Sequence, residues 1–105
     1  DHVHPAVLRE IARVIDIAQT ADLPVSLCGE MSSDPIAVVL LVGMGIRTLS
    51  MSAAQLPKIK WLLRNISVQH AKEIVEATLA LNDARLIRKL VADRLYVLGA
   101  GEIVW

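Results

Sequence analysis

Apolar residues first recur at helical spacing and then form a short run in the first third of the chain. From Pro5, which suits the first position of a helix, apolar residues repeat at helical spacing between Leu8 and Ala18. Residues 25–28 are short and apolar enough to form a buried parallel strand, and residues 29–33 have the composition of a turn. The pattern predicts an amphipathic helix followed by a strand and a loop.

The next segment is apolar on every side. Asp34 is placed to cap a helix and Pro35 to open it, and the apolar run 36–42 continues to Gly43, where we expect the helix to stop. A helix without a polar face lies between other layers of a protein. Residues 48–51 then predict a second short strand.

Three further helices complete the chain. After a loop at residues 52–55, Pro57 opens a helix that runs to Arg64, Ser67 caps the next helix, and the last helix follows a break at residues 82–83. The last two helices are expected to bury one stripe each, formed by Ala71, Ile74, Val75 and Thr78 and by Ile87, Val91, Leu95 and Leu98.

The order helix, strand, helix, strand, helix is typical of βα units on a parallel sheet, so the expected fold class is α/β and rich in helix. Two strands alone make a poor sheet, because parallel strands need both faces covered and a neighbour at each edge. Either copies of the chain associate, or the remaining strands belong to a longer protein from which this chain is cut.

Composition and charge limit the partners and the cellular location that the sequence favours. Hydrophobic residues make up 54% of the 105 residues, and eleven basic residues balance eleven acidic ones, so charge favours neither nucleic acid nor an anionic membrane as partner. The longest apolar run, residues 36–46, is shorter than the roughly 20 residues that cross a bilayer. The single cysteine, Cys28, and a first segment unlike a signal peptide favour the cytoplasm.

Cys28 occupies the best position in the chain for a reactive group, because it ends a predicted strand where parallel strands lead into catalytic loops. On the residues alone a packing role is the commoner one, since free cysteine behaves as a small hydrophobe. Gly29 lets the backbone approach a ligand or simply forms a turn. Glu30 orients the Cys28 loop, or it is a solvated carboxylate or helix-cap partner.

The other polar residues are first interpreted as structural. Ser50 and Ser52 share one face of the second strand, near an end where barrels often bind phosphate, but satisfying backbone groups is the simpler role. Two further sets are expected to be structural or solvent-facing: His2, His4 and His70, which lack the spacing of paired metal ligands, and Lys58, Lys60 and Arg64, which form one basic helix face.

Longer motifs resemble a known family. They are residues 28–35 (Cys-Gly-Glu-Met-Ser-Ser-Asp-Pro), 41–46, 49–52, 56–60 and 64–65, preceded by 4–9 (His-Pro-Ala-Val-Leu-Arg). In order and spacing they resemble the last two βα units of enzyme I of the bacterial phosphotransferase system, a phosphoenolpyruvate–protein phosphotransferase. The resemblance covers residues 4–80. The amino acids at positions 31–33 and 57–61 are more similar to the nitrogen-branch enzyme I than to the sugar-branch one.

The resemblance implies a fragment of a (β/α)8 TIM barrel, at the C-terminal end of the phosphoenolpyruvate-binding domain. Residues 1–66 would form the last two βα units of the barrel, and residues 67–105 the C-terminal helices and tail.

It also implies a role for the cysteine. In the family, phosphoenolpyruvate gives its phosphoryl group to a histidine on another domain, and the residue at the position of Cys28 protonates carbon 3 of the pyruvate enolate. A thiol suits this work because its ordinary pKa of ~8.5 lies near working pH. Gly29 and Glu30 would bind the substrate or orient the cysteine.

The family's other catalytic parts lie on segments that this chain lacks. Mg²⁺ is bound by carboxylates of earlier strands and arginines hold the substrate phosphate, so the resemblance implies that the chain alone is inactive. The full-length enzyme would use phosphoenolpyruvate and pyruvate, pass the phosphoryl group to a histidine phosphocarrier protein, and form a homodimer.

Two alternatives stay open. The chain is a dimerisation or interaction module without activity of its own, or it is a fragment of pyruvate phosphate dikinase or phosphoenolpyruvate synthase, which share the barrel and the Cys-Gly loop.

Overall fold

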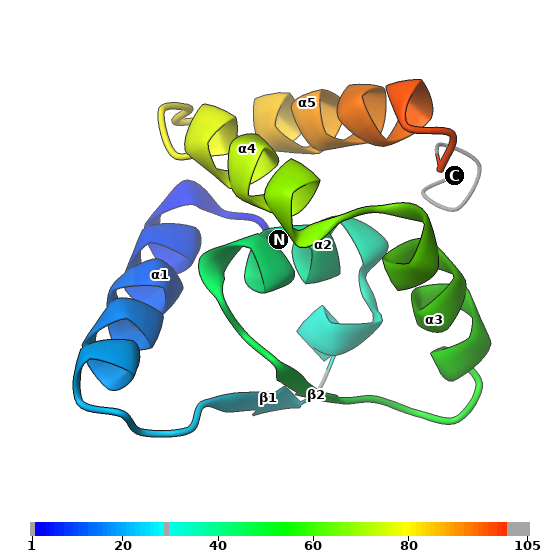
Figure 1. Ribbon diagram of the computed structural model, residues 1–105. Coiled ribbons are helices and arrows are strands. Elements are labelled where there is room, and N and C mark those ends of the chain that lie inside the picture. Colours follow the sequence, from blue (N-terminus) through cyan, green and yellow to red (C-terminus); the bar gives the residue numbers. More distant parts are fainter. Residues whose placement is uncertain (1, 29, 101–105) are drawn as a thin grey trace.

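A computed structural model describes residues 2–28 and 30–100 (Figure 1). This part of the chain forms five α-helices and two short strands, with the strands at one side of the molecule. In chain order the elements are α1 (Pro5–Thr20), β1 (Ser26–Cys28), the 3-10 helix η1 (Glu30–Ser33), α2 (Pro35–Met44), β2 (Thr48–Ser50), α3 (Leu56–Asn65), α4 (Val68–Thr78) and α5 (Ala84–Val97). The predicted order of elements is confirmed, and the loop after β1 contains a 3-10 turn.

The helices that start at Asp34 and Ser67 begin where these capping residues predict, whereas α3 begins at Leu56, one residue before the predicted Pro57. Asp34 caps α2 by accepting a hydrogen bond from the Ile36 amide at 3.1 Å. Ser67 and His70 form a reciprocal capping box at the start of α4, in which each side chain accepts from the backbone amide of the other. Such caps satisfy amides that have no partner inside the helix.

The two strands form a parallel sheet. Leu27 pairs with Leu49, and Cys28 pairs with Ser50 at the last position of both strands. Because the strands are parallel, their carboxyl ends lie at the same edge, and the loops that follow them leave from that edge. Within the described residues each strand pairs only with the other, so both outer edges of the sheet are open.

Helix α2 lies at the centre of the molecule, as its lack of a polar face predicts. Its residues from Ile36 to Leu41 are at most 6% exposed. It packs mainly on α4 and also contacts α1, α3 and α5, which surround it in Figure 1. Residues 67–100 therefore share one core with the βα units that precede them.

The predicted end of α2 at Gly43 is wrong. The helix continues to Met44 and ends at Gly45, whose φ of 114° lies in the left-handed region that glycine adopts readily. A Cβ on Gly43 would collide with the Ala71 carbonyl oxygen and lie 2.6 Å from Cγ2 of Val75. Gly43 is therefore suited to close packing between α2 and α4.

The C-terminal helices bury the predicted stripes with one difference. All four stripe residues of α4 are buried, as are Ile87, Val91 and Leu95 of α5. Leu98 is only half-buried, because α5 ends at Val97 and Leu98 is its C-terminal cap. The chain turns back after this point, and Ala100 is buried in the main core.

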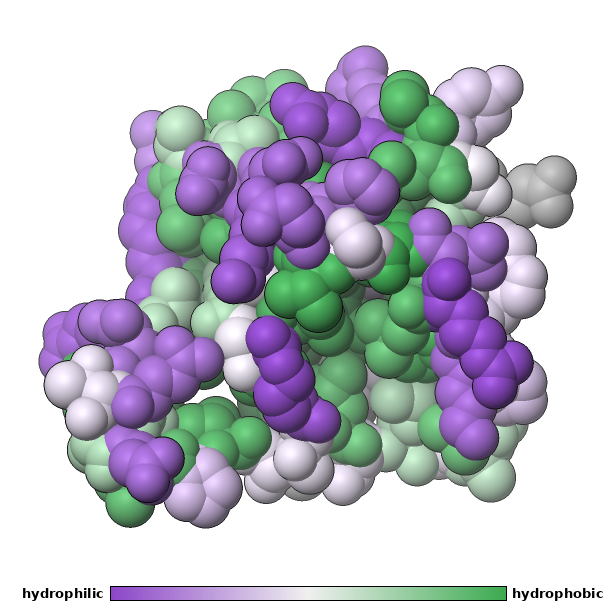
Figure 2. Space-filling model, in the orientation of Figure 1, coloured by the Kyte–Doolittle hydropathy of each residue, from purple (hydrophilic) through white to green (hydrophobic). Residues whose placement is uncertain are grey.

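Apolar side chains remain uncovered beside the open edges of the sheet. Next to β2, an apolar groove of about 370 Å³ runs between the end of α2 and α3. A second apolar hollow of about 310 Å³ lies between α1 and β1. Figure 2 shows apolar surface exposed among polar residues on the face seen in Figure 1. None of the described helices has the length and hydropathy needed to span a membrane.

Candidate functional site

The carboxyl edge of the sheet carries the candidate site. Here the backbone of Cys28 ends β1 and is paired in register with Ser50, the last residue of β2. Gly29, the second predicted site residue, lies outside the described residues. The third, Glu30, begins η1. The predicted cysteine position and the end of the second strand are thus neighbours in space.

An open hollow of about 500 Å³ lies at this edge. Side chains from both loops line it, namely Glu30, Ser33, Ser50, Met51 and Ser52. The serine hydroxyls and the Glu30 carboxylate supply hydrogen-bond donors and acceptors at this edge, beside the apolar Met51 side chain.

The segment after Cys28 is tied back to the strand and to α2. The buried Ser32 donates its hydroxyl to the carbonyl of Leu27 at 3.2 Å. The Asp34 amide donates to the Met31 carbonyl at 3.2 Å, and the Met31 side chain packs against both apolar cores. These contacts hold the segment at a defined distance from the carboxyl edge of the sheet.

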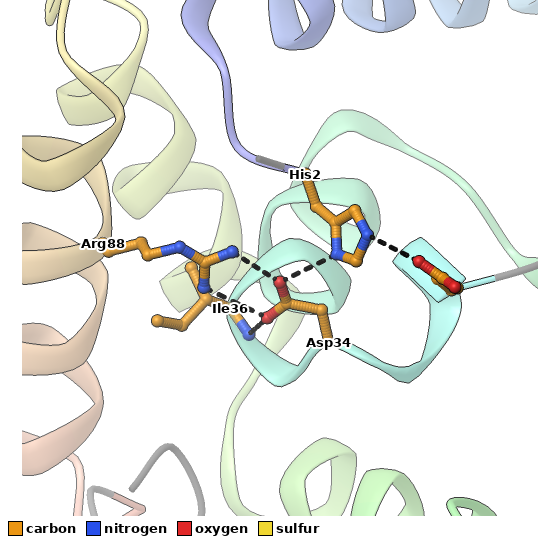
Figure 3. Close-up of polar contacts among 5 residues, drawn as sticks. His2, Asp34, Ile36 and Arg88 are labelled. Carbon is orange, nitrogen blue, oxygen red and sulfur yellow. Dashed lines mark hydrogen bonds and ion pairs between the residues drawn. The ribbon is translucent and has the colours of Figure 1, made fainter.

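A polar network fixes the junction between η1 and α2 (Figure 3). Arg88, on α5, reaches both carboxylate oxygens of Asp34, with nitrogen–oxygen distances of 2.8 Å and 3.5 Å. His2 approaches the same carboxylate through Nδ1 at 3.2 Å and Glu30 through Nε2 at 3.6 Å. The network joins three segments that are distant in sequence: the N-terminal segment, the turn after β1, and α5.

The charge on Asp34 is stabilised by this arrangement. Burial opposes ionisation and raises the pKa of Asp34, since its side chain is only 13% exposed. The hydrogen bond and positive charge of Arg88 outweigh burial, with help from His2 and the Ala37 amide, so the net pKa of Asp34 lies below its ordinary value. Asp34 is therefore an anion that its partners hold in place, with α2 starting from it.

The histidines have separate local partners. His4 accepts from the Ala6 amide at the start of α1, His70 belongs to the capping box of α4, and His2 belongs to the Asp34 network. Within residues 2–28 and 30–100, no group of three or more His, Cys, Asp or Glu side chains could hold a metal ion.

Sequence reasoning missed some residues that shape the site. Ser33 and Met51 line the hollow. Their place there could have been inferred from the sequence, because both lie in segments that follow adjacent strand ends. Ser50 and Ser52, for which the sequence favours a structural role, also line it. No local spacing could reveal Arg88, which lies 54 residues after Asp34.

The chain belongs to the PEP-utilising enzymes. Residues 1–68 match the family described as "PEP-utilising enzyme, PEP-binding domain". This match covers α1, β1, α2, β2 and α3, including the carboxyl edge of the sheet, whereas nearly all of α4 and all of α5 follow it.

Curated relatives extend the similarity beyond that match. A Salmonella typhimurium protein named "Phosphoenolpyruvate-dependent phosphotransferase system" is 35% identical over 99% of this chain and 14% of its own length. A Haemophilus influenzae protein named "Phosphoenolpyruvate-protein phosphotransferase" is 39% identical over 89% of this chain and 16% of its own length. A Cupriavidus necator protein of the same name is 41% identical over 79% of this chain and 14% of its own length. The chain thus spans about a seventh of the length of these relatives.

Proposed function

We propose that this chain is the C-terminal part of the phosphoenolpyruvate-binding (β/α)8 barrel of a phosphoenolpyruvate–protein phosphotransferase, of the nitrogen-branch type. The observation that carries the proposal is the pairing of Cys28 with Ser50 at the carboxyl edge of two parallel strands, in a chain of the PEP-utilising family. Active sites of such barrels lie at this edge of the strands.

In this proposal residues 1–66 supply the last two βα units, and residues 67–105 supply the C-terminal helices and tail. The open outer edges of β1 and β2 support it, because a strand of a closed barrel has a neighbour on each side. The apolar hollows beside both strands are the surfaces that neighbouring βα units would cover.

The proposed chemistry divides between this chain and the rest of the enzyme. Phosphoenolpyruvate gives its phosphoryl group to a histidine nitrogen on another domain, which breaks the bond between phosphorus and the enol oxygen and leaves the pyruvate enolate. The Cys28 thiol then gives its proton to carbon 3 of the enolate, and the thiolate regains a proton from solvent. Cys28 acts as a general acid in the step that completes pyruvate.

The neighbouring residues serve this step. Gly29 lets the backbone approach the substrate, and Glu30 orients the loop from the start of η1, where its carboxylate lines the hollow. Mg²⁺ and the arginines that hold the phosphate would come from barrel strands on other parts of the enzyme. When bound, the metal supplies charge stabilisation for phosphoryl transfer.

The wider role follows from the same proposal. The histidine of the full-length enzyme passes the phosphoryl group to a histidine phosphocarrier protein in the cytoplasm, and the enzyme works as a homodimer. The names of the relatives support phosphoenolpyruvate as the donor.

The test uses radiolabelled phosphoenolpyruvate, the full-length enzyme and Mg²⁺. We expect one pyruvate for each phosphoryl group transferred and an acid-labile, alkali-stable label on the enzyme, as a phosphohistidine gives. The isolated chain is the control and should release no pyruvate, since the metal and phosphate-binding parts are elsewhere. Turnover by the isolated chain, or absence of label on the full-length enzyme, contradicts the proposal.

A further inference from the structure

We propose that Arg88 on α5 is a positioning residue for the turn that follows Cys28, and that it acts through Asp34 and His2. The inference rests on the proposed function, because it gives a C-terminal helix an effect on the proton transfer assigned to Cys28. Its starting point is the network in Figure 3, which connects α5 to the first residue of η1.

The first link is the ion pair between Arg88 and Asp34. The guanidinium reaches both carboxylate oxygens, and the shorter contact of 2.8 Å is a charge-assisted hydrogen bond. The Asp34 side chain is 13% exposed and that of Arg88 is 34% exposed, so solvent screens this pair less than a surface pair. The pair places the end of η1 at a fixed position relative to α5.

The second link runs from Asp34 to the start of η1. The His2 ring lies between two carboxylates, with Nδ1 3.2 Å from Asp34 and Nε2 3.6 Å from Glu30. The contact with Asp34 is within hydrogen-bond distance, whereas the contact with the exposed Glu30 is an ion pair that forms only when the ring is protonated. The ring therefore always contacts the residue that follows η1, and when protonated it also pairs with Glu30 at the start of η1.

The turn depends on such contacts because it is short. A 3-10 helix of four residues has few internal hydrogen bonds and is seldom stable by itself. Ser32 ties its middle to β1, Arg88 and His2 hold Asp34 directly after its end, and a protonated His2 also pairs with Glu30 at its start. Loss of Arg88 would leave the Ser32 bond and the Asp34 cap of α2, so the turn would move without unfolding the helix.

The position of the turn matters for the chemistry because Glu30 lies two residues after Cys28 and lines the hollow at the strand ends. A displacement of about 1 Å in a catalytic group can slow a reaction ~10²-fold. Arg88 follows the segment that matches the family, so its effect would show that the C-terminal helices contribute to the site as well as to the core.

The experiment compares three variants of the full-length enzyme: Arg88→Met, Arg88→Lys and the control Arg85→Met. Arg85 is on the same helix, is 91% exposed, and pairs with Asp83, two residues away in the sequence. For Arg88→Met we expect exchange of pyruvate methyl protons with solvent deuterium to slow by ~10–10²-fold, with phosphohistidine formation nearly unchanged. Arg88→Lys should recover part of the rate, because lysine keeps the charge but not the two-pronged geometry. Arg85→Met should behave like the parent.

A second readout does not depend on activity. The Asp34 amide donates to Met31 across the turn, so its hydrogen–deuterium exchange reports on the order of η1. Exchange at this amide should accelerate in Arg88→Met and not in Arg85→Met. If Arg88→Met keeps the parent rates of methyl exchange and amide exchange, the inference is wrong. It is also wrong if Arg85→Met changes these two rates as much as Arg88→Met does.

The two readouts also separate this inference from the proposed function. If Cys28→Ala exchanges methyl protons normally while Arg88→Met still loosens the Asp34 amide, the acid role of Cys28 fails and the positioning of the turn stands. If Cys28→Ala slows methyl exchange and Arg88→Met changes neither readout, the positioning role fails alone. Should Arg88→Met not fold, Asp34→Asn replaces it, since asparagine keeps the cap of α2 and removes the charge.

Discussion

Cys28 and Ser50 are register partners at the final position of two parallel strands. This pairing brings together the loops that follow β1 and β2, although 22 residues separate the two positions in the sequence. Groups on both loops can therefore act on one ligand. The Arg88–Asp34 pair links α5 to the residue that follows the first of these loops.

Gly43 should not tolerate a side chain. In most helices Gly→Ala stabilises by about 1 kcal/mol, but here the new Cβ would collide with the Ala71 carbonyl oxygen on α4. We expect Gly43→Ala to destabilise the protein by about 1–2 kcal/mol, because overpacking costs more than the helix gains. Thermal unfolding of the full-length variant measures this effect, and an increase in melting temperature would show that α2 and α4 separate easily.

The Asp34 carboxylate should make stability depend on acid. Because its pKa is lower in the folded protein than in the unfolded chain, the unfolded chain takes up this proton first as pH falls. The contribution is fully present above about pH 4, where unfolded aspartate titrates, and is lost as pH falls through the lower folded pKa. We expect Asp34→Asn to lower the free energy of unfolding by about 1–2 kcal/mol at neutral pH. The free energy of unfolding of this variant should also fall less steeply than that of the parent as the pH is lowered.

Chemical denaturation at a series of pH values tests this dependence. Asp93→Asn serves as the control, since Asp93 pairs with Lys89 on the exposed face of α5 and should change stability little. Parallel pH profiles for the parent and Asp34→Asn would mean that the Arg88–Asp34 pair contributes nothing to folding.

The isolated chain should self-associate at micromolar concentration. Both edges of its sheet are open and apolar residues such as Val14 on α1 and Leu63 on α3 are exposed, so a second copy can cover surface that barrel neighbours would otherwise cover. Sedimentation is expected to show species heavier than the 11.5 kDa monomer. A variant carrying Val14→Lys and Leu63→Lys should shift the distribution toward monomer. If the parent chain is a well-folded monomer at high concentration, its uncovered apolar surface no longer supports the proposal that further barrel units normally pack against it.

Local signals in the sequence were sufficient for most element boundaries. Asp34 with Pro35, and Ser67 as a cap, each predict a helix start from chemistry within a few residues, and the structure adds the capping box of Ser67 with His70. The two short apolar segments predict strands, and the parallel arrangement places their ends together. These features are predictable because each depends on neighbours along the chain.

Features that depend on distant segments were not predictable. Gly43 was interpreted as a helix stop because its real neighbour, the Ala71 carbonyl, belongs to another helix. Arg88 and Asp34 are ordinary residues by spacing and become partners only when α5 packs beside the start of α2. The Glu30–His2 contact arises in the same way, from the return of the N-terminal segment to the turn.

The measurement that tests the central claim is the effect of Cys28→Ala on exchange of pyruvate methyl protons with solvent deuterium, followed by NMR in the full-length enzyme with Mg²⁺ and phosphoenolpyruvate. Removing a general acid typically slows the step it serves by ~10²–10⁴-fold, and phosphohistidine formation should be largely unaffected. Ser26→Ala, two residues earlier on β1, is the matched control and should exchange like the parent. If Cys28→Ala exchanges methyl protons as fast as the parent under the same conditions, Cys28 has a structural role and the proposed mechanism is wrong.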